Sequence, residues 1–208
     1  MPLRLFRTTV RVKKQNGETT RVPAIEQLPL TGIINKPDRS VLIIGSAGSG
    51  KSTSLKRLAY ILAERRLVEG DKRKIPIILR AIDFHNDAAS LEELGKIAVA
   101  KILNSEAQFI SDSDFTGGKV CILVDSLDEL PTDNARTAVI KKIQTFHHTF
   151  PKCQVILTSR PLPYIETSPI LAEFSQYNLV SIDFKQAEKI VTRVRRKKSL
   201  PANKTQEL

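Results

Sequence analysis

A glycine-rich loop near residue 50 contains the residue types that bind a polyphosphate. Glycines allow successive backbone N–H groups to turn toward one anion at a helix N-terminus, where the helix dipole is positive. The sequence matches G-x-x-x-x-G-K-S, so the expected ligand-binding residues are Gly45, Ser46, Ala47, Gly48, Ser49, Gly50, Lys51, Ser52 and Thr53. We expect Lys51 to reach the β- and γ-phosphates and the Ser52 hydroxyl to help coordinate Mg²⁺.

A second polar cluster follows the apolar segment 119–124 and reads Asp-Ser-Leu-Asp-Glu. A rigid strand would carry Asp125 beside the loop, where its carboxylate would orient Mg²⁺. Asp128 or Glu129 would then polarise the attacking water as a general base. The sequence leaves this choice open, with a slight preference for Asp128. The alternative interpretation is an acidic helix N-terminus, since carboxylates there also interact favourably with the helix dipole.

A third motif, Thr-Ser-Arg-Pro, begins at the last residue of the apolar segment 154–158. A polar group at this strand end can bond the attacking water or the γ-phosphate. Arg160 would distinguish a triphosphate from a diphosphate through one charge-assisted contact. The alternative is an ordinary solvated arginine before a proline turn.

The elements that position these motifs alternate between strand and helix. Strand patterns occur at 40–44, 74–82, 119–124, 154–158 and 178–182, and helical spacing occurs at 54–63, 90–103, 132–148 and 185–195. Such alternation predicts right-handed crossovers and a parallel sheet covered on both faces. We therefore predict an α/β fold, the three-layer α/β/α arrangement of P-loop NTPases, with a five-stranded, mostly parallel sheet. The carboxyl ends of the strands would bring the three motifs into one crevice.

A small β-hairpin is expected before this domain. Residues 3–12 alternate apolar and basic side chains, Asn16-Gly17 supplies a turn, and 19–22 would be the return strand. Prolines then mark a connector up to residue 39. The predicted divisions are a hairpin and connector at 1–39, the P-loop NTPase domain at 40–184, and the start of a helical lid with a basic tail at 185–208.

Charge is concentrated at the two ends of the chain, which has a net charge of +11. Residues 1–21 hold six basic and one acidic side chain, residues 185–208 hold eight and two, and the rest is balanced. Basic ends can bind nucleic acid through non-specific electrostatics. They can equally be solvated or pack on another domain, and no aromatic residues interrupt the basic segment 193–198.

Several classes of protein are disfavoured by composition. No apolar stretch is long enough to span a membrane, and the first residues lack a secretory signal. Cys121 and Cys153 are each expected inside a buried strand as reduced thiols, without the spacing of a zinc site. We therefore expect a cytoplasmic protein.

Together the three motifs resemble the NACHT branch of the STAND NTPases over about residues 40–190. That branch has a small residue after the Mg²⁺ aspartate and an acid two positions beyond it, which Ser126 and Asp128 match. Its sensor motif ends in Ser-Arg, matched by Ser159 and Arg160. The resemblance implies a switch controlled by ATP and ADP: ADP holds a closed monomer, and ATP or a trigger opens it for assembly. Similar proteins serve in innate immunity, programmed cell death and bacterial defence against phage.

The resemblance has limits. Family members usually continue into a helical lid, a winged-helix domain whose histidine contacts the β-phosphate, and a repeat sensor. This sequence ends at Leu208, where the lid would begin, and its three histidines precede the sensor motif. We expect either a piece of a larger protein or a compact NTPase that works with other chains. Self-association or contact with other protein domains would then involve the missing C-terminal region.

Other functions stay open. The basic ends motivate a nucleic-acid-stimulated ATPase of the AAA+ or helicase kind. A non-catalytic module, in which nucleotide only stabilises a protein-binding surface, is the other alternative, although two acids after Asp125 argue against it. GTP is less expected than ATP because the guanine-reading Asn/Thr-Lys-x-Asp motif is absent; residues 203–206 come nearest and lack the aspartate.

Overall fold

A computed structural model describes residues 4–15, 18–35, 40–70, 74–104, 110–161, 171 and 174–179, with the backbone alone for residues 4, 6–15, 18–26 and 35. Its helices are α1 (Lys51–Glu69), α2 (Ala81–Phe84), α3 (Leu91–Leu103), α4 (Asp112–Thr116) and α5 (Asp133–Thr149), with 3-10 turns η1 (Leu30–Asn35) and η3 (Leu127–Glu129). Its strands are β1 (Arg4–Gln15), β2 (Glu18–Pro29), β3 (Ser40–Ile44), β4 (Ile75–Arg80), β5 (Val120–Asp125), β6 (Gln154–Ser159) and β7 (Ser175–Leu179).

One sheet contains all of these strands, in the order β2-β1-β7-β3-β6-β5-β4. The five strands from β7 to β4 run parallel, which confirms the predicted α/β fold. Strand β6 therefore lies next to β3, the strand that precedes the glycine-rich loop, and β5 lies on the other side of β6. This order explains how motifs far apart in the sequence come together.

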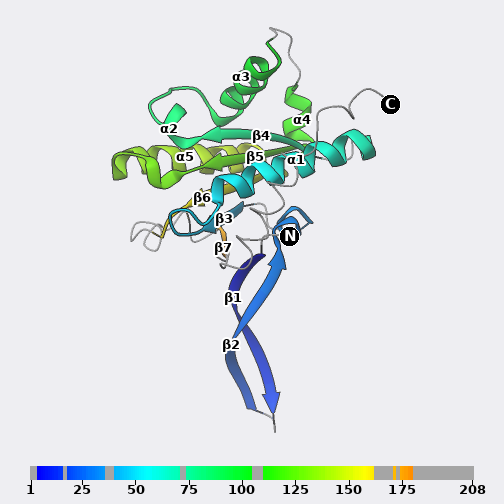
Figure 1. Cartoon of the computed structure of the whole chain (residues 1–208), viewed down its shortest axis with the longest axis vertical. Helices are drawn as coiled ribbons and strands as arrows, with labels where there is room; N and C mark the ends of the chain where they lie inside the picture. The colour runs from blue at the N-terminus through cyan, green and yellow to red at the C-terminus, as the bar shows by residue number, and fades with distance from the viewer. Residues whose placement is uncertain are drawn as a thin grey trace, which may run out of the picture.

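Helices cover both faces of the sheet, as predicted. Along β5, Ile122 and Val124 belong to the core cluster that includes α3, α4 and α5, whereas Cys121 and Leu123 belong to the cluster that includes α1. Because both faces are buried, the strand is a continuous apolar run rather than an alternating one. Figure 1 shows the resulting layers around the central strands.

The N-terminal hairpin differs from the prediction. It was expected to be small and to end near residue 22, but β2 continues to Pro29, through part of the predicted connector. Two prolines are tolerated there because β2 is the edge strand, where one side needs no backbone donor. Leu5 and Phe6 pair antiparallel with β7, so the hairpin extends the same sheet, and its outer part extends away from the body (Figure 1).

Helix starts follow the local sequence signals. Ser90 and Glu93 form the predicted capping box: the Glu93 N–H donates to Ser90 Oγ at 3.2 Å, and the Ser90 N–H donates to Glu93 Oε2 at 2.7 Å. The Thr132 hydroxyl accepts from the Ala135 N–H at 3.1 Å and starts α5. Helix α1 is longer than predicted, since it begins at Lys51 directly after the loop.

The bounds of two strands differ from the predicted ones by a few residues. Strand β4 ends at Arg80 because the chain turns there into α2. The fifth parallel strand begins at Ser175, earlier than predicted. The prediction missed this start because the residues around Tyr177 are polar, although Tyr177 itself is fully buried. Residues 180–182 of that prediction and the helix expected at 185–195 lie outside the described residues.

Both cysteines are free and buried. Cys121 lies within β5 as expected, but Cys153 precedes β6, so its placement inside a strand was wrong. Burial raises the pKa of the Cys121 thiol to about 12 and also raises the pKa of Cys153. Both thiols are therefore small apolar groups rather than nucleophiles. In the part of the chain that the structure describes, no helix combines the length and apolar character needed to cross a membrane.

Candidate nucleotide-binding site

The three predicted motifs meet at the carboxyl edge of the parallel strands. A cavity of about 300 Å³ lies there, lined by Ala47, Gly48, Gly50, Lys51, Ser52, Thr53, Ser126, Asp128, Glu129 and Arg160. Asp125 lines an adjoining cavity of about 390 Å³, together with Ser52, Ser126 and Glu129. Gly45, Ser46 and Ser49 line neither cavity and instead shape the loop.

The loop conformation depends on its glycines. Gly48 and Gly50 adopt φ values of 73° and 93°, in the left-handed region that favours glycine. A Cβ atom on Gly45 would lie 2.5 Å from Ser49 Oγ, so any other residue at that point would require the Ser49 side chain to move. The Gly45 N–H donates to the Ser159 carbonyl at 3.1 Å and ties the loop to β6.

Lys51 folds back over the loop. Its Nζ donates to the carbonyls of Gly45 at 2.7 Å and Ser46 at 3.0 Å, and the residue is only 8% exposed. Burial lowers the pKa of Lys51; the carboxylate of Asp128 opposes this shift, and the charge of Arg160 adds to it. The ammonium therefore lies at the cavity wall, where a phosphate oxygen can replace a carbonyl partner.

Asp128 and Arg160 are joined by two contacts. Arg160 Nε lies 2.8 Å from Asp128 Oδ2, and the Arg160 N–H donates to Asp128 Oδ1 at 3.1 Å. The Asp128 side chain is 6% exposed, whereas that of Arg160 is 53% exposed. Both carboxylate oxygens of Asp128 thus have partners on Arg160, a pairing that sequence reasoning did not anticipate.

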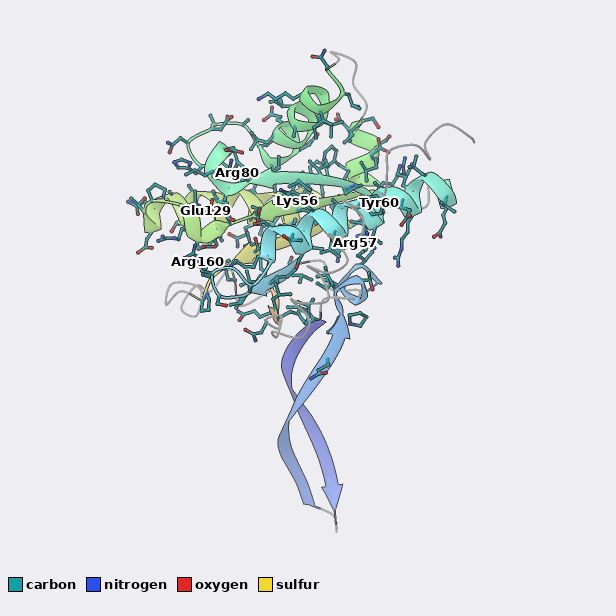
Figure 2. All side chains as sticks on the ribbon, viewed as in Figure 1. Lys56, Arg57, Tyr60, Arg80, Glu129 and Arg160 are labelled. Carbon is teal, nitrogen blue, oxygen red and sulfur yellow. The ribbon has the colours of Figure 1, made fainter. Side chains whose placement is uncertain are left out.

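Glu129 is the accessible carboxylate of the pair, with a side chain 48% exposed, and it lines both cavities. Arg80 Nη2 lies 3.9 Å from Glu129 Oε2, and Arg80 Nη1 lies 3.9 Å from Asp83 Oδ1. Figure 2 shows Arg80, Glu129 and Arg160 along the same end of the strands. Sequence reasoning missed Arg80, although it is the last residue of strand β4, opposite Asp125 in the parallel register.

Thr158 is a second residue whose role was missed. Its hydroxyl donates to Asp125 Oδ1 at 2.7 Å and accepts from the Ser126 N–H at 3.0 Å. The available signal was a hydroxyl side chain at the end of an otherwise apolar strand segment, next to the segment that ends in Asp125.

The donor set fits a magnesium ion better than a transition metal. Ser52 and Asp125 line the same cavity, and hydroxyl and carboxylate oxygens suit Mg²⁺, which takes one or two protein ligands besides phosphate and water. Within the described ranges, no three or more His, Cys, Asp or Glu side chains gather as a metal site. A site of this kind would therefore depend on the phosphates of a nucleotide for its remaining ligands.

Known structures share this fold. The Aeropyrum pernix ORC1 protein in complex with DNA matches 80% of this chain and 46% of its own, with a TM-score of 0.52 and 15% identity. A replication initiator DnaA bound to AMPPCP and single-stranded DNA matches 84% of this chain and 51% of its own, with a TM-score of 0.50 and 18% identity. At these identities the similarity shows the fold alone.

Comparison by sequence identifies the family of the chain more specifically than similarity of fold does. The human NLR family CARD domain-containing protein 3 is 24% identical over 171 residues, covering 74% of this chain. The chain spans only 15% of that relative's length. The model of the NACHT domain matches residues 39–198, most of the sequence and all three motifs. With a P-loop, two acids that follow a strand end and an arginine around one cavity, this chain belongs to the NACHT domain family of P-loop NTPases.

Proposed function

We propose that this chain is an ATP-binding, Mg²⁺-dependent NTPase domain that hydrolyses nucleotide slowly and acts as a nucleotide-controlled switch. The observation that carries the proposal is the convergence of Lys51, Glu129 and Arg160 on one cavity beside Asp125. Each comes from a different strand end of the parallel sheet or from the loop beside it.

The phosphates would be held by the N–H groups at the start of α1 and by Lys51, which is already at the cavity wall. Ser52 and Asp125 would hold Mg²⁺. When bound, the ion would offset the phosphate charge and favour in-line attack by water. Thr53 also lines the cavity, so it would contact the bound nucleotide.

The contacts favour separate roles for the two acids. Asp128 has both oxygens paired with Arg160, so it is better suited to positioning that arginine than to accepting a proton. Glu129 is half exposed and lines the cavity, as a general base must to contact water. We therefore assign the base to Glu129, which changes the slight preference for Asp128 taken from the sequence.

The state of the switch would depend on whether Arg160 binds Asp128 or the γ-phosphate of the nucleotide. A γ-phosphate offers the guanidinium a competing charged acceptor, whereas ADP leaves it with Asp128. The exchange would alter the link between η3 and the end of β6, and so the surface presented to other domains.

The biological setting is proposed from similarity. The human NLR family CARD domain-containing protein 3 supports a role in signalling of the innate-immunity or anti-phage defence type. Assembly with further copies or with other domains would follow from the switch. DNA-bound structures of the same fold, ORC1 and DnaA, and the basic chain ends motivate testing nucleic acid as the alternative activator.

The test measures phosphate release from Mg²⁺–ATP by wild type, Lys51→Ala and a matched control, Lys101→Ala, which removes an exposed lysine on α3. Slow turnover that requires Lys51 and ignores added DNA or RNA supports the switch. Turnover that rises severalfold with nucleic acid supports the AAA+-like alternative. Tight ATP binding without turnover would leave a nucleotide-stabilised interaction module. Unchanged ATP affinity in Lys51→Ala would refute the site itself.

A further inference from the structure

The end of strand β6 contains a fully buried polar side chain, Thr158. A buried hydroxyl needs a hydrogen-bond partner, because burying one without a partner is unfavourable. The Thr158 hydroxyl meets this need at the end of the neighbouring strand β5, with one bond to a side chain and one to the backbone.

The first bond reaches the carboxylate expected to orient the metal. Thr158 donates its only hydroxyl proton to Asp125 Oδ1 at 2.7 Å. A carboxyl group attached to a strand end otherwise rotates broadly about its χ2 torsion. This contact restricts the rotation of the carboxylate and uses one oxygen, which leaves Oδ2 to serve Mg²⁺ or a water in its shell.

The second bond holds a strained turn. Ser126 has φ 61° and ψ 59°, and Asn104 is the other described residue besides glycine with positive φ. Asn104 is a helix C-cap, where that conformation is common. For serine the left-handed conformation is unfavourable, because Cβ comes too close to the following carbonyl oxygen. The N–H of Ser126 donates to the Thr158 hydroxyl at 3.0 Å, and the chain then turns into η3, which carries both acids.

We propose that Thr158 is a positioning residue that sets the metal-orienting carboxylate and the water-activating turn with a single hydroxyl group. The inference rests on the proposed function, since it needs nucleotide and Mg²⁺ at this site. Thr158 lines neither cavity, so it acts only through Asp125 and Ser126. We therefore expect loss of the Thr158 hydroxyl to weaken the binding of Mg²⁺ but not the binding of phosphate by the loop.

The experiment titrates a non-hydrolysable fluorescent ATP analogue into wild type, Thr158→Val and Thr158→Ser, with EDTA and across a Mg²⁺ series. Valine keeps the shape and the strand preference of threonine, and serine keeps the hydroxyl. In Thr158→Val we expect unchanged affinity in EDTA and a half-saturating Mg²⁺ concentration raised about tenfold, which is the lower end of the effect of removing a hydrogen-bond partner of a metal ligand. Thr158→Ser should resemble wild type.

A second variant separates the two bonds. Ser126→Gly accepts the left-handed turn without strain, so in Thr158→Val it should restore part of the turnover but none of the Mg²⁺ affinity. An equal Mg²⁺ requirement in Thr158→Val and wild type would overturn the inference. Lost affinity in EDTA with a normal melting temperature would also overturn it, by making Thr158 a loop-shaping residue. Should Thr158→Val fail to fold, Thr158→Ala gives the same comparison. If wild type itself does not bind the analogue, the proposed function fails instead.

Discussion

Replacing Asp128 and Glu129 one at a time by their amides tests the division of labour between the two acids. Asp128 is almost excluded from water and has two partners on Arg160, whose guanidinium is half exposed. Exposed ion pairs contribute about 0.2–1 kcal/mol, and hydrogen bonds to charged groups contribute about 1.5–3 kcal/mol. A half-screened pair lies between these ranges, at about 1 kcal/mol. Asp128→Asn should release Arg160 toward a γ-phosphate and raise the preference for ATP over ADP about fivefold.

The loss of kcat, in contrast, should be larger for Glu129→Gln than for Asp128→Asn. A general base contributes about 100-fold or more, so Glu129→Gln should lower kcat by at least that factor with little change in nucleotide affinity. Asp128→Asn should lower kcat less than about tenfold, because only the position of Arg160 changes. Equilibrium titration with ATP and ADP, followed by single-turnover phosphate release, measures both quantities. A loss in Asp128→Asn as large as that in Glu129→Gln, or normal turnover in Glu129→Gln, refutes the assignment.

Three further perturbations address the surrounding contacts. Arg80→Gln removes a long, exposed contact to Glu129 and should change kcat less than about threefold, with an effect that salt abolishes; a tenfold loss in single-turnover assays would show a larger role. Gly45→Ala should weaken ATP binding at least about tenfold, because its Cβ would meet Ser49 Oγ at 2.5 Å, and adding Ser49→Ala should recover part of the affinity; calorimetry with no recovery would point to the backbone instead. Burial lowers the pKa of Lys51, so the folded state disfavours the charged form of this side chain. ATP affinity should therefore decline as the pH rises, at pH values below the ordinary lysine range, and the domain should gain stability over the same interval. Lys51→Arg should abolish the decline in ATP affinity, and an identical pH profile for that variant would refute the cause.

Much of the fold was predictable because its signals are local. Buried parallel strands are short apolar runs, and the capping box at Ser90 reports a helix start within four residues. The prediction of the hairpin was less accurate, because prolines normally end strands and only the edge position of β2 permits them. Polar residues likewise hid the start of β7, where Tyr177 is buried by neighbours distant in sequence.

The amino-acid sequence by itself determined which chemical groups the site can contain. A phosphate loop, an acid after an apolar strand and a terminal arginine are contiguous patterns whose chemistry depends on residue type and spacing. Only the tertiary structure decided how those groups are paired. Asp128 meets Arg160, Thr158 meets Asp125, and Arg80 approaches Glu129 across adjacent strands whose order and register follow from packing of the whole sheet. Contacts between strand ends depend on that global arrangement, and no local pattern of residues encodes them.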